Sequence, residues 1–159
     1  MNFIVAVQAL ADEGVDFVII GGWSAILHGS SSVTNDLDIC YSRNSDNLKR
    51  LASALAAFHP RLRDLSQDLP FVWDQATLRN AAILTLSTDL GAIDLLAEVS
   101  GLGGFEDVKA HSILVQAFER EIWTLDLPAL IRTKRAAGRA KDLQVLPELE
   151  GLLEAGEPE

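Results

Sequence analysis

Apolar residues recur at helical spacing in three stretches of the chain. Residues 2–13 carry them three and four positions apart, which predicts a helix with one buried face. Residues 45–58 repeat this pattern, and Ser45 is the expected N-cap of that helix. Near the C-terminus, Asp126 is a suitable N-cap for a helical segment that we expect over residues 126–153, and Gly138 is expected to interrupt that helix or to mark its end.

Short apolar runs rich in β-branched residues predict strands between these helices. The run at 16–20 is typical of a buried strand, whereas residues 37–41 alternate between two faces. Residues 82–86 and 92–96 form a predicted hairpin around a polar, glycine-containing turn. Further short strands are expected at residues 112–115 and 121–125. Because helices alternate with strands and a helical segment follows, the fold class is α/β or α+β.

Composition narrows the class of protein. The chain has 159 residues, with 13 Lys plus Arg against 23 Asp plus Glu, and a formal net charge of −10. This length suits one domain, expected over residues 1–150, with a frayed tail at 154–159. The acidic balance argues against a broad nucleic-acid-coating surface, since phosphate binding needs clustered Lys and Arg. The one cysteine, Cys40, is interpreted as a reduced core thiol, and no apolar run could span a membrane, so a cytoplasmic protein is expected.

Three aspartates are the sharpest chemical feature. Asp36 and Asp38 lie two apart on an expected strand, so their side chains share a face about 6–7 Å apart. Carboxylates this close repel each other unless a cation lies between them, and Mg²⁺ prefers such oxygen ligands. Asp94 lies inside another apolar run, where an ionised carboxylate needs a partner such as the same metal ion. The alternatives are solvated strand positions for all three.

A glycine pair precedes the aspartates. Gly21 and Gly22 lie between the expected strand at 16–20 and a short helix expected at 23–28. Such a turn presents free backbone amides and allows close approach to the backbone, and both properties suit phosphate. The alternative is an ordinary glycine turn.

Together these features resemble the nucleotidyltransferase fold of the DNA polymerase β superfamily. The similarity is to its minimal nucleotidyltransferases, including those of bacterial toxin–antitoxin and abortive-infection operons, and it covers roughly residues 15–150. The matching pieces are Gly21-Gly22-Trp23-Ser24-Ala25, His28-Gly29, Thr34, Asp36-Leu37-Asp38, Gly91-Ala92-Ile93-Asp94-Leu95-Leu96, Leu130-Ile131 and the basic run at 134–142. The resemblance implies a mixed β-sheet flanked by helices, with a helical C-terminal segment.

The resemblance also implies an activity. A nucleotidyltransferase of this kind moves a nucleoside monophosphate from an NTP, with ATP as the expected donor, to a hydroxyl of a partner protein or an RNA. Asp36, Asp38 and Asp94 would be both the catalytic residues and the ligands of Mg²⁺ or Mn²⁺. The chemistry that the resemblance implies uses two metal ions: Asp36 and Asp38 would bridge the ions that carry the triphosphate, and Asp94 would hold the second ion and orient or deprotonate the attacking hydroxyl. No membrane partner is expected.

Nucleotide-binding residues are expected at the glycine turn and in the basic run. The set is Gly21, Gly22, Ser24, Thr34, Lys134 and Lys141. Lys134 and Lys141 are seven apart, so they would share a face if the helix were continuous. The alternative for the basic run is a solvated basic face. For Ser24 the alternative is a helix-capping hydroxyl, and for Thr34 it is a hydrogen bond in the turn at Asp36. Asp142 is expected to pair with a neighbouring cation rather than with metal.

One departure from the family pattern favours a second hypothesis. Ser32 stands two residues before Thr34, where related sequences often carry an arginine, and the loop at 30–33 has no positive charge. This departure favours a catalytically weak nucleotide- or partner-binding module that acts as an antitoxin or regulator. The presence of three mutually repelling carboxylates favours the enzyme.

Overall fold

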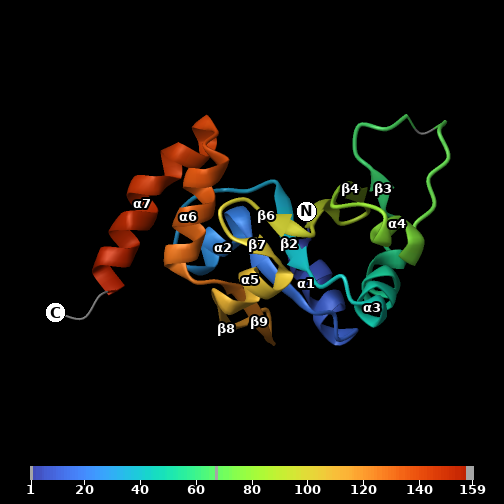
Figure 1. The fold of residues 1–159 in the computed structure, drawn as a ribbon, viewed down its shortest axis with the longest axis horizontal. Helices are drawn as coiled ribbons and strands as arrows, with labels where there is room; N and C mark the ends of the chain where they lie inside the picture. The colour runs from blue at the N-terminus through green and yellow to red at the C-terminus, as the bar shows by residue number, and fades with distance from the viewer. Residues whose placement is uncertain (1, 67, 157–159) are drawn as a thin grey trace.

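The computed structural model describes residues 2–66 and 68–156, and within them helices cover both faces of a central sheet (Figure 1). The helices are α1 (Phe3–Asp12), α2 (Gly21–Leu27), α3 (Ser45–Ala56), α4 (Gln75–Arg79), α5 (Phe105–Ala110), α6 (Leu127–Ala137) and α7 (Ala140–Gly156). The strands are β1 (Phe17–Ile20), β2 (Asp36–Tyr41), β3 (Arg61–Leu62), β4 (Ile83–Thr88), β5 (Gly91–Leu96), β6 (Glu98–Val99), β7 (Gly103–Gly104), β8 (Ser112–Ala117) and β9 (Arg120–Leu125).

The central sheet is mixed. Within the described residues it has seven strands in the order β3-β4-β5-β2-β1-β9-β8, while β6 and β7 form a separate pair. Strand β2 runs parallel to β5 and antiparallel to β1, and β1 runs parallel to β9. A mixed sheet flanked by helices, followed by a helical C-terminus, confirms the predicted fold class.

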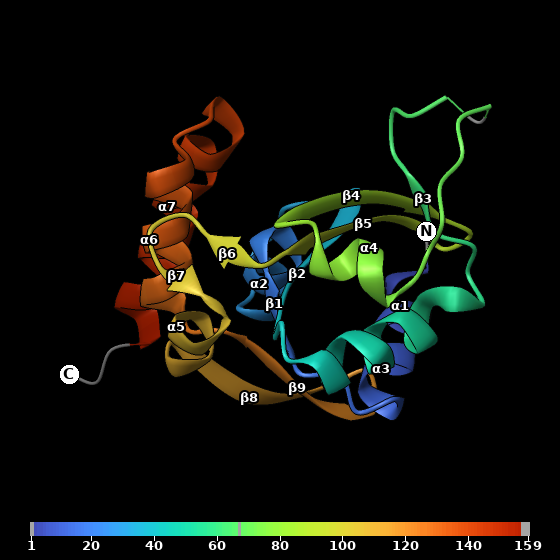
Figure 2. The same cartoon turned by 45° about the vertical axis from the view of Figure 1, so that its right-hand side comes forward.

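Alternating side chains of the central strands divide the core into two layers. Leu37, Ile39 and Tyr41 of β2 are fully buried in the layer formed with α1, α3 and α4. Cys40 belongs to the opposite layer, formed with α2, α5, α6 and α7. Figure 2 shows α3 beside α1, with α6 and α7 together at the far end of the molecule. Because side chains alternate along a strand, Asp38 shares the α6 and α7 face with Cys40.

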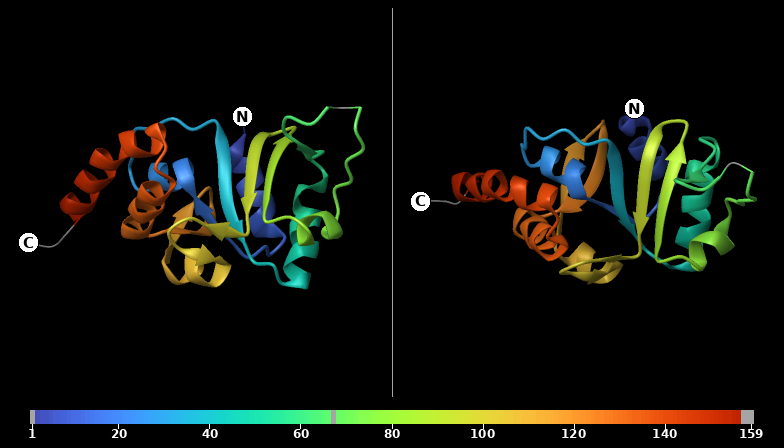
Figure 3. Two further views of the ribbon diagram at one scale, coloured as in Figure 1. Left: turned by 45° about the horizontal axis from the view of Figure 1, so that its top comes forward. Right: turned by 90° about the horizontal axis from the view of Figure 1, so that it is seen from above.

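The hairpin of β4 and β5 lies on the other side of β2 from β1. Figure 3 shows that the segment between β3 and α4 projects at the end of the molecule opposite to α7. The turn consists of Asp89 and Leu90, and Gly91 follows with φ of 120°, a conformation that favours glycine. The predicted hairpin is therefore confirmed, with both strands extended toward a tighter turn.

Several helix ends differ from the expected ones. Asn44, not Ser45, caps α3, because its side-chain oxygen accepts a hydrogen bond of 2.9 Å from the N–H of Asp46. Helix α7 continues to Gly156, beyond the expected end at residue 153. Residues 157–159 of the expected frayed tail lie outside the described residues. Helices α4 and α5 were not predicted, since they are too short to show a helical period.

The interruption expected at Gly138 is confirmed, so the basic run does not lie on one continuous helix. Helix α6 ends at Gly138, whose φ of 66° is left-handed, and α7 begins at Ala140. Glycine is the residue that most readily adopts this conformation at a helix C-terminus. Lys134 and Lys141 therefore come from two different helices. No helix in the described part of the chain has the length and apolar character needed to cross a membrane.

Candidate functional site

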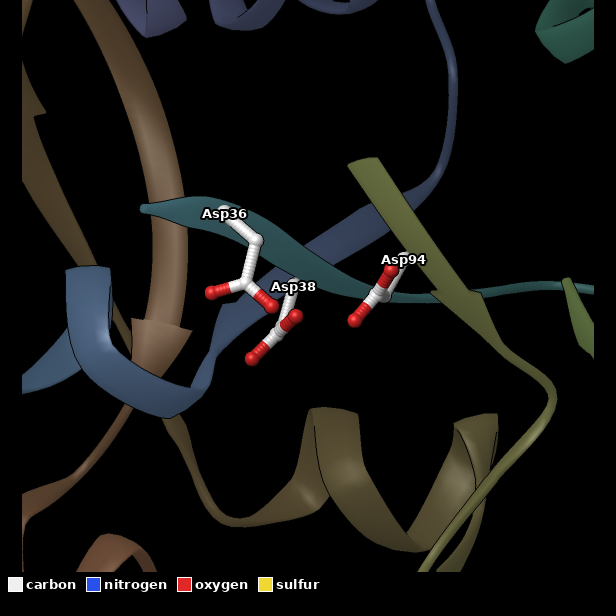
Figure 4. Close-up of side chains that lie close together, drawn as sticks. All are labelled: Asp36, Asp38 and Asp94. Carbon is white, nitrogen blue, oxygen red and sulfur yellow. The ribbon is translucent and has the colours of Figure 1, made fainter. Parts of the chain in front are cut away.

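The side chains of Asp36, Asp38 and Asp94 converge above the centre of the sheet (Figure 4). Asp36 and Asp38 project from β2, and the parallel pairing with β5 places Asp94 directly beside Asp38. One carboxylate oxygen from each residue lies within 4.8 Å of the other two. Oxygens at this spacing suit a hard divalent cation. In the described residues no other group of three His, Cys, Asp or Glu side chains is placed this way.

Asp38 is the carboxylate that most needs a compensating positive charge. Burial raises its pKa to about 7, and the negative charges of Asp36 and Asp94 add to the shift. Its Oδ1 atom is buried and has no hydrogen-bond partner among the described residues. Buried polar atoms are normally satisfied, so this oxygen lacks a donor or a cation. The three residues therefore fit a divalent metal ion such as Mg²⁺ or Mn²⁺.

Asp94 has a cationic partner that sequence reasoning missed. An Nη2 hydrogen of Arg63 donates to Oδ1 of Asp94 at 2.6 Å, and the same nitrogen contacts the carbonyl oxygen of Leu86 at 2.8 Å. Burial raises the pKa of Asp94, although the hydrogen bond and charge of Arg63 oppose the shift. Arg63 follows β3 in a stretch that showed no periodicity, so no local pattern marks it as part of the site.

The glycine pair brings the backbone close to the carboxylates. Gly21 has φ of 66°, and a Cβ at this position would overlap Oδ2 of Asp38. A Cβ on Gly22 would lie 2.8 Å from Oγ1 of Thr34. Larger residues at either position would therefore displace a neighbouring side chain. Both glycines line the clefts beside the carboxylates, and their contact with a nucleotide stays a prediction.

Ser24 and Thr34 have different environments. Ser24 is fully buried, and its hydroxyl shares a hydrogen bond of 2.7 Å with Thr124. The expected phosphate contact of the Ser24 hydroxyl is not supported, because this group is committed inside the core. Thr34 donates a hydrogen bond of 3.1 Å to Oδ1 of Asp36, which helps hold that carboxylate at the start of β2. This contact is the hydrogen bond that was the alternative for Thr34.

Basic side chains from two helices line the clefts. Both clefts are lined by Lys134 of α6, Arg139 of the connection between the helices and Lys141 of α7. Asp142 is 1% exposed and pairs with Arg139 at 2.6 Å and with Lys134 at 3.4 Å. Burial alone would raise the pKa of Asp142, but the Arg139 hydrogen bond and the Lys134 charge lower it overall. The prediction that Asp142 pairs with a cation is confirmed, whereas Arg139 was not among the predicted site residues.

Two clefts meet at Asp36 and Asp38. A cleft of about 440 Å³ follows the loop before β2 and is lined by Gly22, Thr34 and the basic residues described above. A second cleft, of about 280 Å³, includes Asp94 and has apolar walls formed by Ile83, Leu96 and Val99. A wider hollow of about 510 Å³ lies elsewhere, and none of the three carboxylates lines it. Size alone therefore does not identify the site.

The serine loop before Thr34 is tied to α7. Glu148 accepts hydrogen bonds from the N–H of Ser31 at 3.1 Å, from its hydroxyl at 2.8 Å and from the hydroxyl of Ser30. The loop thus contacts an acidic side chain through Ser30 and Ser31, next to Ser32, where related sequences often carry an arginine. Positive charge reaches the clefts from Arg63, α6 and α7 instead.

Three other side chains are explained by packing. His28 is within 2.7 Å of the Leu125 carbonyl through Nε2, as expected of a structural histidine at a helix end. The Trp23 ring makes an edge contact with Phe3 at a centroid distance of 5.3 Å. Cys40 is fully buried, and burial raises the pKa of its thiol to about 12, which confirms an unreactive core cysteine.

Comparison with solved structures identifies the fold. The chain is similar to a proposed nucleotidyltransferase from Thermotoga maritima, with a TM-score of 0.56, 16% identity, and 92% of this chain and 88% of that chain covered. It is also similar to an antigenic nucleotidyltransferase-like protein from Paracoccidioides brasiliensis, with a TM-score of 0.53, 13% identity, and 99% and 77% covered. These likenesses show the nucleotidyltransferase fold. No family model and no curated protein matches the sequence.

Proposed function

We propose that the protein is a metal-dependent nucleotidyltransferase, with one catalytic unit spanning residues 1–150. It moves a nucleoside monophosphate from an NTP to an acceptor hydroxyl. The observation that carries this proposal is the convergence of Asp36, Asp38 and Asp94 on one ion-sized point in a nucleotidyltransferase fold. The buried, unpartnered Oδ1 atom of Asp38 supports a cation at that point.

The carboxylates would hold the metal, and Asp94 would also accept a proton. Asp36 and Asp38 would hold a first Mg²⁺ or Mn²⁺ ion, and Asp94 would hold the second. Bound ions of this type stabilise the attacking and leaving oxygens of an in-line displacement. Asp94 orients the acceptor hydroxyl and takes its proton, while the acceptor oxygen bonds to the α-phosphorus and pyrophosphate leaves.

The basic residues of the clefts bind the triphosphate of the donor, for which we propose ATP. Lys134 and Lys141 act as point charges, and Arg139 supplies the fork geometry that suits phosphate oxygens. Gly21 and Gly22 line the clefts without a side chain, so the triphosphate can approach their backbone. For the acceptor we propose a hydroxyl of a partner protein or an RNA, in a toxin–antitoxin setting.

A second candidate function is a nucleotide- or partner-binding antitoxin or regulatory module with little transferase activity. The ion pair of Arg63 with Asp94 favours it, because it engages an oxygen of one proposed metal ligand. The serine loop tied to Glu148, which lacks a cation of its own, favours it as well.

Thermal unfolding with Mg²⁺ and each of the four NTPs tests nucleotide binding. A ligand at one hundred times its Kd stabilises by about 2.7 kcal/mol. For a chain of this length that corresponds to a rise in Tm of roughly 5–10 °C. The double variant Asp36→Ala, Asp38→Ala should lose the shift, whereas Asp46→Asn, on an exposed turn of α3, should retain it. A flat response to all four NTPs would contradict the proposed nucleotidyltransferase and the nucleotide-binding form of the second candidate, and NTP binding without transfer would support the second candidate.

A further inference from the structure

Arg63 lies in line with the proposed metal ligands across three strands. Its backbone N–H bonds the carbonyl of Thr85 on β4 at 2.8 Å, Thr85 pairs with Asp94 on β5, and Asp94 pairs with Asp38 on β2. This register continues the edge of the sheet into the carboxylate cluster. The Arg63 side chain follows the same row and reaches across β4 to Asp94.

The Arg63 guanidinium is only partly satisfied where it lies. Nη2 makes both of its hydrogen bonds, one to Asp94 and one to the carbonyl of Leu86. Its Nε atom is buried and has no acceptor in the described part of the chain. The side chain is 28% exposed and lines the cleft that also contains Lys134 and Lys141. Arg63 is therefore bound to Asp94 but is not locked there by a full set of acceptors.

The three carboxylates differ in what neutralises them. Asp94 has an arginine bonded to it, whereas Asp36 and Asp38 form no ion pair within 4.0 Å with any described residue. A charge-assisted hydrogen bond of 2.6 Å satisfies a carboxylate oxygen that a metal would otherwise use. Asp36 and Asp38 are thus free of ion pairs within the described residues, whereas Asp94 is already paired with Arg63.

We propose that Arg63 is an internal substitute for the metal ion at Asp94. Its guanidinium neutralises Asp94 while that ion is absent, and it releases the carboxylate when the ion binds. Two ions consequently bind with unequal affinity, first at Asp36 and Asp38 and then at Asp94. Arg63 is a positioning residue, and this inference rests on the proposed function, because it assumes that Asp94 is a metal ligand.

Mn²⁺ titration of metal-stripped protein, followed by calorimetry and by electron paramagnetic resonance, tests the proposal without relying on activity. Arg63→Gln removes the positive charge and should increase the affinity for the more weakly bound ion about tenfold. The affinity for the more tightly bound ion should stay nearly unchanged. Arg61→Gln is the matched control, since Arg61 lies on the same edge strand and pairs with Ser87 in the next row. It should bind both ions as the unmodified protein does.

Thermal unfolding gives a second readout. Without metal, Arg63→Gln should melt at a lower temperature, because Asp94 loses its counter-charge. In excess Mn²⁺ the deficit should shrink or reverse, since the ion replaces the arginine. Arg63→Lys retains the charge and should give an intermediate Mn²⁺ affinity, which keeps the test usable where the glutamine variant folds poorly.

The outcomes separate this inference from the proposed function. If the unmodified protein binds two ions and Arg63→Gln binds the weaker one no more tightly, the inference is overturned while the proposed function stands. If neither protein binds Mn²⁺ and the Asp36, Asp38 and Asp94 variants behave like the unmodified protein, the proposed function fails and this inference fails with it.

Discussion

Replacement of Asp38 by asparagine should make the metal-free protein more stable at neutral pH. Asparagine has nearly the same shape as aspartate and carries no charge. The substitution therefore removes the repulsion with Asp36 and Asp94 and the burial of a charge, and introduces little change in packing. A gain in stability on removing a buried charge is unusual for a structural residue and is expected where carboxylates are gathered for a cation.

The size of the effect follows from the pKa of Asp38. Burial and the neighbouring carboxylates raise it from 3.8 to about 7, a shift of roughly three units. Each pKa unit corresponds to about 1.36 kcal/mol, so ionised Asp38 destabilises the folded protein by on the order of 4 kcal/mol. This value applies above pH 7, where the side chain is ionised in both the folded and the unfolded protein.

The pH window distinguishes this effect from a change in packing. Below about pH 4, Asp38 is protonated in both states, so its contribution to stability is not reduced. As pH rises from about 4 to about 7, the unfolded chain has lost the proton and the folded protein still holds it, so stability falls. Asp38→Asn lacks this dependence. The advantage of the variant should therefore grow through that window and level off above pH 7.

Urea denaturation in EDTA at pH 5, 6, 7 and 8 measures this difference directly. Adding Mg²⁺ should reduce the difference in the free energy of unfolding between the two proteins, because the ion stabilises the unmodified protein and not the variant. Asp46→Asn serves as the control for replacing an exposed carboxylate. The reasoning is refuted if Asp38→Asn is less stable than the unmodified protein at pH 8, or if the difference does not change with pH.

Substitutions elsewhere test the supporting parts of the site. Gly21→Ala should lower the free energy of unfolding, measured by urea denaturation, by about 1–3 kcal/mol, because Gly21 has a left-handed φ and lies against the Asp38 carboxylate. Gly151→Ala, in open space on α7, should raise the free energy of unfolding by about 0.5–1 kcal/mol. Asp142→Asn should raise the KM for NTP about tenfold, because Lys134 and Arg139 lose the carboxylate that positions them. Glu150→Gln breaks an exposed ion pair between α6 and α7 and should leave KM unchanged. Equal effects of the two substitutions on KM would contradict a role for the buried pair. Cys40 should react with thiol reagents only as fast as the protein unfolds, and rapid labelling of the native protein would show that the core assignment is wrong.

Much of the fold follows from short-range patterns. Alternation over residues 37–41 predicted the two faces of β2, and the structure places Leu37 and Cys40 in opposite layers. The predicted N-cap at Asp126 is confirmed by its hydrogen bond with the N–H of Ala129. These features depend on residues close in sequence, so a single chain is enough to predict them.

The features that sequence reasoning missed depend on contacts between distant residues. Arg63 meets Asp94 only because β3 joins the sheet edge beside β4, and no periodicity marks this pairing. Ser24 is a plausible phosphate ligand from its place after the glycines, but its hydroxyl is bonded to Thr124, which is 100 positions away.

The most direct test of the central claim is transfer of label from NTPs carrying ³²P at the α- or the γ-phosphate, with total RNA and a cell lysate as acceptors. A nucleotidyltransferase should attach the α-label to an acceptor in a product that survives denaturation, in the presence of Mg²⁺ or Mn²⁺. The γ-label should be released in pyrophosphate, and Asp94→Asn should abolish the product. Transfer of the γ-label, or α-label transfer that is unchanged in Asp94→Asn, would contradict the account.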